Sequence, residues 1–450
     1  MMNMNLITIE RHRSSEPELV VNRETAFDVG IERKKRAYIS FGNQKYCVDV
    51  AVLDTVSRGK LFIPAYIIDK MHVPDYVVYE VRAYGNEIRL GPFIGILGSV
   101  RYENITKDRL EHEKECIRDY SKLHGAITVF SLDSVNKDKR LIKGFCFNPE
   151  DNSWKEGIFP YPCAIYRTIG LNEDWQNHFL STIGDTVFNG QYFSKWEMYK
   201  WFSTDASIKD SLPETRLYRS EKDIFDMLKR QKCVYIKPDW GMKGHGVVKA
   251  SITDEGILFE YRKDKKNNRI VAENRIKAIR IMKDLFAYNE CIIQKGIDLI
   301  KCDEGVVDFR AVMQKDGTAN WVCTVIVARA GAKRSVVSNI SSGGKGFMPE
   351  ELLKDVMGMN NRRALQKIIE MRKFCLKVCR TLDGFGVNCG ILGIDIGIDY
   401  TGKIWLIEIN HRSPHPAIAL CIQDRTSYNK IISGPLLYAK SLAGFGRNVR

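Results

Sequence analysis

Hydrophobic positions change their spacing along the chain, and these changes divide it into segments of different character. Residues 1–24 are mostly polar after residue 10 and predict a loose lead-in. Between residues 25 and 100, short β-branched and aromatic runs alternate with tight-turn pairs such as Gly42-Asn43, which is typical of hairpins. We therefore expect a small β-rich N-terminal module over 25–100, closed by the glycine-rich run 91–99.

A mixed pattern begins at residue 101. The charged segment 103–125 predicts an amphipathic helix, and the apolar run 126–132 that follows predicts a strand. Residues 101–185 thus indicate a small α/β unit, and over 186–450 helical and strand patterns alternate with long hairpins. The expected fold class is α/β, or α+β, with more than one structural unit.

The composition is that of a globular protein. Of the 450 residues, 44% are hydrophobic and 28% are charged, which excludes disorder over most of the chain. No run approaches the roughly 18 apolar residues of a membrane-spanning helix, and the first residues hold too short an apolar stretch for a secretory signal. Twelve cysteines without a CxxC pair favour reduced thiols in the cytoplasm over disulfides or zinc. Cys375 and Cys379, at helical spacing, predict one apolar helix face.

The net charge is positive. The 69 basic and 55 acidic residues give +14, which favours anionic partners such as nucleotides, acidic peptides or nucleic acid without choosing among them. The basic residues are spread along the chain, and no basic stripe is interleaved with aromatic residues. Nucleic-acid binding is therefore the weakest of these readings.

The first motif with chemical character lies at residues 234–250. A β-branched and aromatic strand leads to Lys237, and the loop after it holds Gly241, Gly244 and Gly246. Glycines let backbone N–H groups approach an anion closely, and a lysine beside them supplies positive charge for phosphates. The order of residues matches neither a Walker A loop nor a Rossmann fingerprint. A glycine-rich hairpin turn beside a surface lysine is the other reading of this segment.

A second motif combines Asp395 in an apolar strand with Glu408 and Asn410 in the strand that returns after a turn. Glu408 and Asn410 are two residues apart, so their side chains leave the same face, and Asp395 can lie opposite them. Two carboxylates and an amide oxygen form a hard, oxygen-only set that suits Mg²⁺ or Mn²⁺. The polar face of an edge hairpin is the alternative, but it does not explain a glutamate and an asparagine within the apolar run WLIEIN.

Two weaker patterns lie between these motifs, and the first is the apolar strand over 291–299. Its polar ending can present backbone groups to the edge of a heterocycle, with an acidic side chain placed for a hydroxyl group. The residues concerned are Gln294, Lys295, Ile297 and Asp298.

The other pattern is the hairpin 306–331, which places Asp308 and Arg310 on one strand face and Arg329 late on the return strand. The two arginines are either anion-binding groups or partners in structural ion pairs.

In this order along the chain, the patterns resemble the ATP-grasp superfamily: a phosphate lysine with a glycine loop, a hinge strand, a D-x-R strand, then Asp and E-x-N. The match is closest to the YheC/YheD-type family associated with endospore coats. Sequence patterns that resemble this family also appear in 188–215 and 337–353. The resemblance covers residues 185–425 well. It implies an ATP-grasp fold, in which two subdomains over 186–450 clamp ATP between antiparallel sheets after a pre-ATP-grasp α/β unit over 101–185.

The resemblance also implies roles on the nucleotide side. Lys195, which opens a helix, matches the first phosphate lysine, and Lys237 matches the second, with the loop of Gly241–Gly246 as a mobile lid. The positions that match the adenine hinge and a ribose contact are Gln294, Lys295, Ile297 and Asp298. Gln294 stands where many members of the superfamily carry glutamate.

Further implied roles concern the metal and the transferred phosphate. The positions that match the metal ligands of this superfamily are Asp395, Glu408 and Asn410. The positions that face the γ-phosphate or an acyl-phosphate intermediate in ligases of this fold are Arg310, Arg329 and Asn339. No serine, cysteine or histidine receives a catalytic role, and His245 and His411 are expected to be packing or surface residues.

The activity that the resemblance implies is ATP- and Mg²⁺-dependent ligation. Enzymes of this fold typically phosphorylate a carboxylate and let an amine or thiol displace the phosphate. In this protein the carboxylate is expected to belong to an amino acid or a peptide. A spore-coat or assembly protein that binds ATP without turning it over is the alternative from a different class. The expected partners are ATP, an unidentified carboxylate and an unidentified amine or thiol acceptor. The candidates for these substrates include a peptide or a coat protein. No membrane partner is expected. The expected location is cytoplasmic, with a spore association implied by the resemblance alone.

Overall fold

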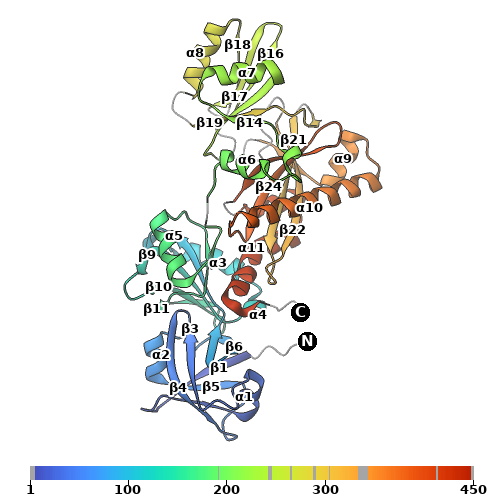
Figure 1. Cartoon of the computed structure of the whole chain (residues 1–450). Helices are drawn as coiled ribbons and strands as arrows, with labels where there is room; N and C mark the ends of the chain where they lie inside the picture. The colour runs from blue at the N-terminus through green and yellow to red at the C-terminus, as the bar shows by residue number, and fades with distance from the viewer. Residues whose placement is uncertain are drawn as a thin grey trace.

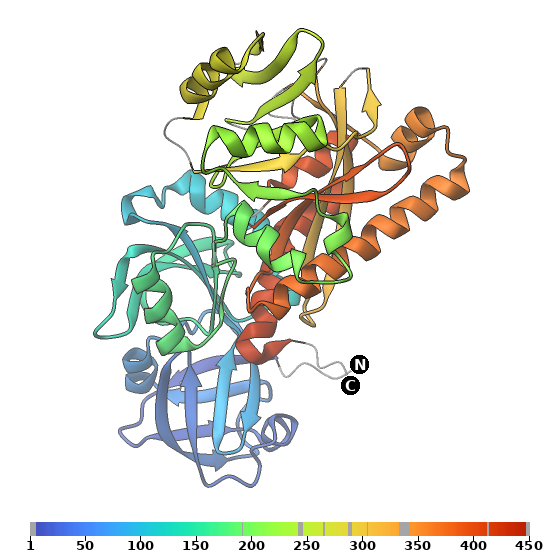
Figure 2. The ribbon, with the colours of Figure 1, turned by 45° about the horizontal axis from the view of Figure 1, so that its top comes forward.

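The computed structural model describes residues 6–190, 192–241, 246–263, 266–286, 290–303, 305–332, 343–411 and 414–446. Their strands form a closed barrel and three further sheets. The barrel lies at one end of an elongated molecule, the second sheet follows, and the third and fourth sheets occupy the other end (Figure 1, Figure 2). Within these residues, no helix combines the length and the apolar character that crossing a membrane requires.

The N-terminal barrel closes in the strand order β1-β5-β2-β4-β3-β7-β6. Its strands are β1 (Leu6–His12), β2 (Glu18–Val21), β3 (Arg36–Phe41), β4 (Gln44–Val52), β5 (Lys60–Pro64), β6 (Val78–Tyr84) and β7 (Glu87–Gly91). Two short helices accompany them, α1 (Arg23–Val29) and α2 (Ala65–Met71). The hairpin predicted at Gly42-Asn43 is confirmed, because Phe41 pairs with Gln44 across it and Gly42 has a φ of 56°.

The prediction of a loose lead-in over residues 1–24 is wrong. Both β1 and β2 lie there, and β1 pairs with β5 on one side and β6 on the other. Ile7 and Ile9 alternate along β1, as Leu19 and Val21 do along β2, and all of them are buried in the barrel. The polar residues between them are the outward positions and the connecting turn.

The second sheet has the order β11-β10-β9-β8-β12-β13. Its strands are β8 (Phe93–Ser99), β9 (Ala126–Asn136), β10 (Leu141–Asn148), β11 (Ser153–Pro160), β12 (Ala164–Arg167) and β13 (Val187–Phe188). The run that was expected to close the N-terminal module is β8, which instead lies inside this sheet, parallel to β9 and β12. Every residue of β8 is buried, as in parallel strands that are covered on both faces.

The helices of this part also differ from the prediction. The single helix expected over 103–125 is divided into η1 (Tyr102–Asn104), α3 (Lys107–Cys116) and α4 (Tyr120–Leu123), and α5 (Glu173–Ile183) follows later. The Thr106 side chain accepts a hydrogen bond from the Arg109 backbone N–H and so fixes where α3 begins. The strand expected over 126–132 is confirmed within β9.

The third sheet is antiparallel, with the order β14-β19-β15-β16-β17-β18. Its strands are β14 (Thr215–Leu217), β15 (Cys233–Pro238), β16 (Val248–Thr253), β17 (Gly256–Lys263), β18 (Lys266–Ala272) and β19 (Cys291–Lys295). Helices α7 (Glu221–Gln231) and α8 (Arg275–Phe286) contribute Ile224 and Met282 to the core that also buries Phe259. Before this sheet the chain forms α6 (Lys195–Ser203) and η2 (Lys209–Ser211).

The fourth sheet is also antiparallel, with the order β23-β22-β21-β24-β25 and β20 paired to β21. Its strands are β20 (Lys301–Cys302), β21 (Gly305–Lys315), β22 (Trp321–Ala330), β23 (Lys345–Phe347), β24 (Ile391–Ile398) and β25 (Ile404–Asn410). Helices α9 (Pro349–Met357) and α10 (Asn361–Gly384) share its core. Cys375 and Cys379 are buried on α10, which confirms the predicted apolar face.

The C-terminal helix connects the parts of the molecule. Preceded by η4 (Pro416–Ile422), α11 (Arg425–Lys440) runs between the second and fourth sheets (Figure 1). The Gln314 side chain on β21 donates to the Ile431 carbonyl at 3.0 Å, while Leu436 lies in the core of the second sheet. The turn η5 (Ser441–Phe445) then reaches the barrel, where Arg82 donates to the carbonyl of Gly444 at 3.0 Å.

Candidate nucleotide and metal site

The predicted phosphate lysines meet the predicted metal ligands where the third and fourth sheets face each other. Lys237 lies near the end of β15 and Lys195 is the first residue of α6. The Nζ atom of Lys195 lies 3.4 Å from Oε1 of Glu408 on β25 and donates to the Gly241 carbonyl at 3.1 Å. Residues from three distant parts of the sequence thus form one polar cluster.

Helix α6 holds Lys195 through its N-terminal cap. Ser194 and Glu197 form a capping box, in which each side chain bonds to the other residue's backbone N–H. The Asp239 carboxylate accepts from the Trp196 N–H at 2.7 Å, and the Asp239 carbonyl accepts from the Lys195 N–H at 3.3 Å. Asp239 therefore links the end of β15 to the start of α6 and fixes the two lysines relative to each other.

Asp239 is a site residue that the sequence analysis missed. It is buried and follows Pro238 directly in the run Lys237-Pro238-Asp239. An acidic residue next to a candidate phosphate lysine was the available signal, because a carboxylate there must cap or pair with something other than the anion.

The charge state of Lys237 reflects its surroundings. Burial lowers its pKa to about 8, with Lys195 acting in the same direction and the carboxylates of Glu408 and Asp395 opposing. Its Nζ donates to Oε1 of Gln294 at 2.6 Å. A lysine that is partly desolvated beside another lysine is well placed to gain from a bound anion.

The three predicted metal ligands share one face of a hairpin. Asp395 on β24 lies directly opposite Glu408 on β25, and the Asn410 Nδ2 donates to Oδ2 of Asp395 at 3.2 Å. The register shifts beyond Asp395, since Ile396 pairs with Leu406, and this leaves Ile407 as the extra residue of a β-bulge. Bulges re-aim side chains next to functional sites.

Two arginines complete this face of the fourth sheet. Arg310 lies opposite Asp395 on the neighbouring strand and forms a two-point ion pair with it, with Nη2 2.9 Å from Oδ2. Arg329 pairs with Asp308 and also places Nη2 3.1 Å from Oδ1 of Asp395. Both arginines thus form ion pairs, which is one of the two alternatives that the sequence left open. These ion pairs lie inside the candidate site.

The pairing determines the charge of Asp395. Burial disfavours its carboxylate, but the charges of Arg310 and Arg329 outweigh burial and lower the pKa of Asp395 to about 2. For the Arg329 guanidinium, burial acts against the charge, while Asp308 and Asp395 raise its pKa above the usual value. Both members of the network remain ionised throughout the physiological pH range.

The donor set fits a hard divalent cation. Asp395, Glu408 and Asn410 offer only oxygen atoms, which Mg²⁺ and Mn²⁺ prefer. In the part of the chain that the structure describes, no group of three or more His, Cys, Asp and Glu side chains gathers to hold a metal ion. A cation here would therefore bind two carboxylates and the Asn410 amide oxygen, and it would compete with Arg310 for Asp395.

The predicted adenine hinge lies on β19 and the segment after it. Gln294 is buried, and its Nε2 donates to Oγ1 of Thr215 at 3.2 Å while its Oε1 holds Lys237. The Lys295 N–H donates to the Glu214 carbonyl at 2.8 Å, which leaves its carbonyl as the group available to a heterocycle. The Gln294 side chain therefore positions Lys237, a predicted phosphate lysine.

The contacts of Ile297 and Asp298, the last two predicted hinge positions, add little to their predicted roles. Ile297 accepts a backbone hydrogen bond from Leu299 at 2.9 Å. The Asp298 side chain is 80% exposed and lies 3.9 Å from Lys301, outside the cluster around Lys237. Its assignment to a ribose contact stays a prediction.

The glycine loop is described only at its two ends. Gly241 is exposed, and Gly246 has a φ of 73°, where a side chain would also bring Cβ within 2.8 Å of Pro238 Cγ. The proposed lid residue Gly244 and His245 lie outside the described residues, as does Asn339. His411 Nε2 donates to the Phe193 carbonyl at 3.1 Å and the His411 ring packs 4.4 Å from the Phe193 ring, which confirms it as a packing residue.

Two antiparallel sheets that face each other, one with the predicted phosphate lysine Lys237 and the other with an Asp and Glu-x-Asn hairpin, define the class of protein as an ATP-grasp protein with a mixed α/β fold. The family follows from a direct comparison of sequences. The chain belongs to the YheC/D like ATP-grasp family, whose sequence model matches residues 184–442.

Two curated proteins of Bacillus subtilis (strain 168) are similar to this chain. Endospore coat-associated protein YheD is 24% identical over 349 residues, which cover 74% of this chain and 75% of YheD. Endospore coat-associated protein YheC is 20% identical over 297 residues, which cover 64% of this chain and 81% of YheC.

Solved structures of ATP-grasp ligases are similar at lower identity. The ligase PsnB, complexed with a phosphomimetic variant of its minimal precursor, Mg and ADP, is 12% identical with a TM-score of 0.44, over 79% of this chain and 99% of PsnB. The VanG D-Ala:D-Ser ligase from Enterococcus faecalis is 10% identical with a TM-score of 0.44, over 78% of this chain and 98% of VanG.

Proposed function

We propose that this protein is an ATP- and divalent-metal-dependent ligase, which activates a carboxylate as an acyl phosphate and joins it to an amine or thiol. The observation that carries the proposal is the meeting of cationic and acidic groups where the two sheets adjoin. Lys195 Nζ on α6 lies 3.4 Å from Glu408 Oε1 of the fourth sheet and 3.1 Å from the carbonyl of Gly241, which follows β15 of the third sheet. This arrangement suits a polyphosphate with its metal ion.

The lysines support the nucleotide part of the proposal. Lys195 and Lys237 are close enough for the charge of one to lower the pKa of the other. A triphosphate between them would replace this repulsion by attraction, and Lys237 is already oriented by Gln294 at 2.6 Å. The Asp239 cap keeps Lys195 beside the glycine loop, where the phosphates would lie.

The acidic hairpin supports the metal part. Asp395, Glu408 and Asn410 would hold Mg²⁺ or Mn²⁺, which supplies charge neutralisation at the phosphate oxygens when bound. Glu408 is the exchangeable member of the set, because its side chain is 32% exposed and its partner in the cluster is Lys195. Asp395 is already ionised and held in place by two arginines.

The arginines support acyl-phosphate chemistry. In the first step, a carboxylate oxygen of the substrate forms a bond to the γ-phosphorus, and the bond from that phosphorus to the β–γ bridging oxygen breaks to release ADP. In the second step, the amine or thiol of the acceptor attacks the acyl carbon and loses a proton, and inorganic phosphate leaves. Arg310 and Arg329 would neutralise the charge that accumulates where carboxylate and phosphate meet. These steps require no side-chain nucleophile.

A second function has specific support. The relatives YheD and YheC are described as endospore coat-associated, and this chain carries a barrel and a second sheet before the nucleotide-binding part. A protein that binds ATP as a structural or regulatory ligand, and that assembles with a coat, would need the lysines and the acidic hairpin but no turnover.

Trapping the acyl phosphate separates the two functions. The purified protein is incubated with ATP, Mg²⁺ and hydroxylamine, which intercepts acyl phosphates as hydroxamates, against panels of amino acids and dipeptides. The proposal expects sustained ADP release and hydroxamate formation with a defined carboxylate. Glu408→Gln should lose at least about 100-fold in rate, because preorganised electrostatic groups contribute factors of that order.

The matched control is Glu156→Gln in the second sheet, another glutamate paired with a lysine, since it lies 2.7 Å from Lys143. This variant should release ADP at the wild-type rate. ADP release without any carboxylate dependence, or equal rates in Glu408→Gln and wild type, would contradict the ligase. ATP binding without release under every condition would favour the assembly function.

A further inference from the structure

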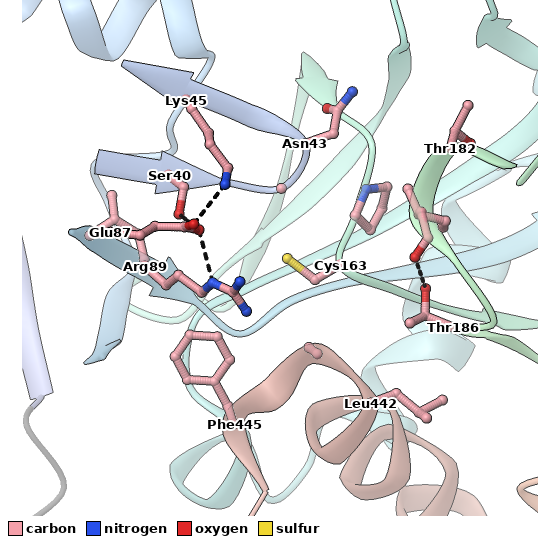
Figure 3. Close-up of a pocket in the computed structure, with 15 residues that line it drawn as sticks. Ser40, Asn43, Lys45, Glu87, Arg89, Cys163, Thr182, Thr186, Leu442 and Phe445 are labelled. Atoms are coloured by element: carbon pink, nitrogen blue, oxygen red, sulfur yellow. Dashed lines mark hydrogen bonds and ion pairs between the residues drawn. The ribbon is translucent and has the colours of Figure 1, made fainter. Parts of the chain in front are cut away.

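A cavity of about 280 Å³ lies at the junction of the barrel, the second sheet and the C-terminal turn (Figure 3). Its barrel wall carries a charged cluster, and its other walls come from the end of α5 and from η5. None of its lining residues belongs to the third or fourth sheet, so it is separate from the lysine and metal cluster.

The charged cluster is organised around Glu87 on β7. Its carboxylate accepts from Ser40 Oγ at 2.7 Å, from Lys45 Nζ at 2.6 Å and from Arg89 Nε at 2.9 Å (Figure 3). Burial opposes the ionised form, but these three donors together lower the pKa of Glu87 to about 2. Two cations against one ionised carboxylate leave a net charge of about +1 at this wall.

The cations keep hydrogen-bonding capacity beyond Glu87. Arg89 uses Nε for the carboxylate, and its guanidinium lies 5.0 Å from the centre of the Tyr84 ring. Among the described residues, its Nη1 and Nη2 atoms have no hydrogen-bond partner, and Lys45 uses one of its three donors. Figure 3 shows the guanidinium extending from Glu87 toward Cys163 and Phe445.

The remaining walls are mainly apolar. Leu442, Ala443 and Phe445 of η5 line one side, and Ile183 and Cys163 line the other. Burial raises the pKa of the Cys163 thiol to about 11, so it presents a neutral surface at physiological pH. An ion-pair wall facing an apolar wall matches the common design of small-molecule sites, in which a few polar groups orient a mainly apolar ligand.

We propose that this junction cavity binds a small organic monocarboxylate, whose carboxylate pairs with Arg89 and Lys45 and whose apolar body packs against Phe445 and Leu442. Arginine binds carboxylates through two parallel N–H donors, and Nη1 and Nη2 of Arg89 provide such a pair. Glu87 acts as the positioning residue, since it holds both cations at the wall. Because the walls come from three parts of the chain, the ligand would also fasten those parts together.

Benzoate and hexanoate are suitable probes, with benzamide as the neutral match of benzoate. Calorimetry on the full chain should detect binding of at least one carboxylate at millimolar concentration and no binding of benzamide. Arg89→Gln and Ala443→Leu should each weaken that binding by at least about tenfold, by removing the charge-assisted pair or by filling the cavity. The control is Arg58→Gln, an arginine on the barrel surface that pairs with Glu24 and Asp28.

A measurement on the unmodified protein keeps the test independent of variant folding. Residues of η5 line the cavity, whereas α8 lies in the core of the third sheet. Benzoate or hexanoate, whichever binds, should slow amide hydrogen exchange in peptides that cover η5, read by mass spectrometry, and leave exchange in α8 unchanged. Absence of carboxylate binding to the wild type, equal binding in the variants, or unchanged exchange in η5 would overturn the proposal.

Discussion

At the scale of single residues, Lys237 lies where burial and the surrounding charges act against each other. Burial lowers its pKa to about 8, Glu408 opposes this effect and Lys195 adds to it. In the folded protein, Lys237 is thus protonated below pH 8 and increasingly neutral above it. A bound phosphate needs the protonated form, so nucleotide binding should depend on pH in the window just above 8.

We expect ATP affinity to be constant from pH 6.5 to 7.5 and to fall above pH 8, approaching tenfold per pH unit, as Lys237 loses its proton. The Lys237→Arg variant keeps its charge throughout this range, so its affinity should not show the fall. Calorimetric titrations at pH 7 and pH 9 provide the measurement. The same loss of affinity in both proteins would mean that another group is responsible.

Asp395 presents the opposite case, a buried anion held by two cations. Replacing it with asparagine keeps the shape but leaves the partly buried Arg310 beside a neutral group, while Arg329 keeps Asp308. We expect Asp395→Asn to lower the free energy of unfolding by about 3 kcal/mol at pH 7, because removing one partner of a buried pair costs that much. Urea denaturation checks the value, and Asp54→Asn, at an exposed pair with Arg23, should give no measurable change.

At the scale of elements, short strands are fixed by contacts that neighbouring residues do not reveal. Asn189 follows β13 and has a φ of 58°, a conformation that asparagine tolerates. Its Oδ1 accepts from the Gly390 N–H at 2.7 Å, and its Nδ2 donates to the Ile391 carbonyl at 2.8 Å. One buried side chain thereby ties the second sheet to the start of β24, the strand that carries Asp395.

Asn189→Ala should destabilise the protein by about 2–3 kcal/mol, since it leaves buried backbone groups at Gly390 and Ile391 without their partner. Thermal and urea unfolding measure the loss. The exposed Asn104 provides the control, and Asn104→Ala should be nearly neutral. Equal stability of Asn189→Ala and wild type would show that these bonds are replaced by water.

Some helices, strands and site contacts of this protein could be predicted from the sequence, and others could not. Hairpins such as β24–β25 follow from turn residues and strand alternation, and the pairing of Asp395 with Glu408 follows from that hairpin. The bulge at Ile407 and the cap made by Asp239 depend on three-dimensional contacts with no local pattern. The same holds for β8, because a fully apolar run does not indicate which sheet will cover it.

At the scale of the whole molecule, the C-terminal helix holds the barrel to the rest. Lys440 at the end of α11 is buried against Glu80 of β6 and donates to the Lys122 carbonyl at 2.8 Å. These residues are far apart in the sequence, so this junction could not be predicted from local patterns. Because α11 also contacts β21, it connects the barrel with the sheet that carries the candidate site.

Lys440→Met should lower the free energy of unfolding by about 3 kcal/mol, because Glu80 would remain buried without its partner. The double variant Glu80→Gln with Lys440→Met should recover part of this loss, since it leaves no unpaired charge. Urea denaturation of the single and double variants gives the coupling between the two positions. Losses that simply add would contradict a direct interaction.

The measurement that tests the account most directly is calorimetric titration of the wild type with ATP, with and without Mg²⁺, beside Lys237→Ala and Glu408→Ala. Lys143→Ala is the control, a lysine paired with Glu156 in the second sheet. We expect Mg²⁺-dependent ATP binding in wild type and Lys143→Ala, and its loss in both site variants. A folded wild type that binds no ATP, or site variants that bind it as wild type does, would contradict the nucleotide site.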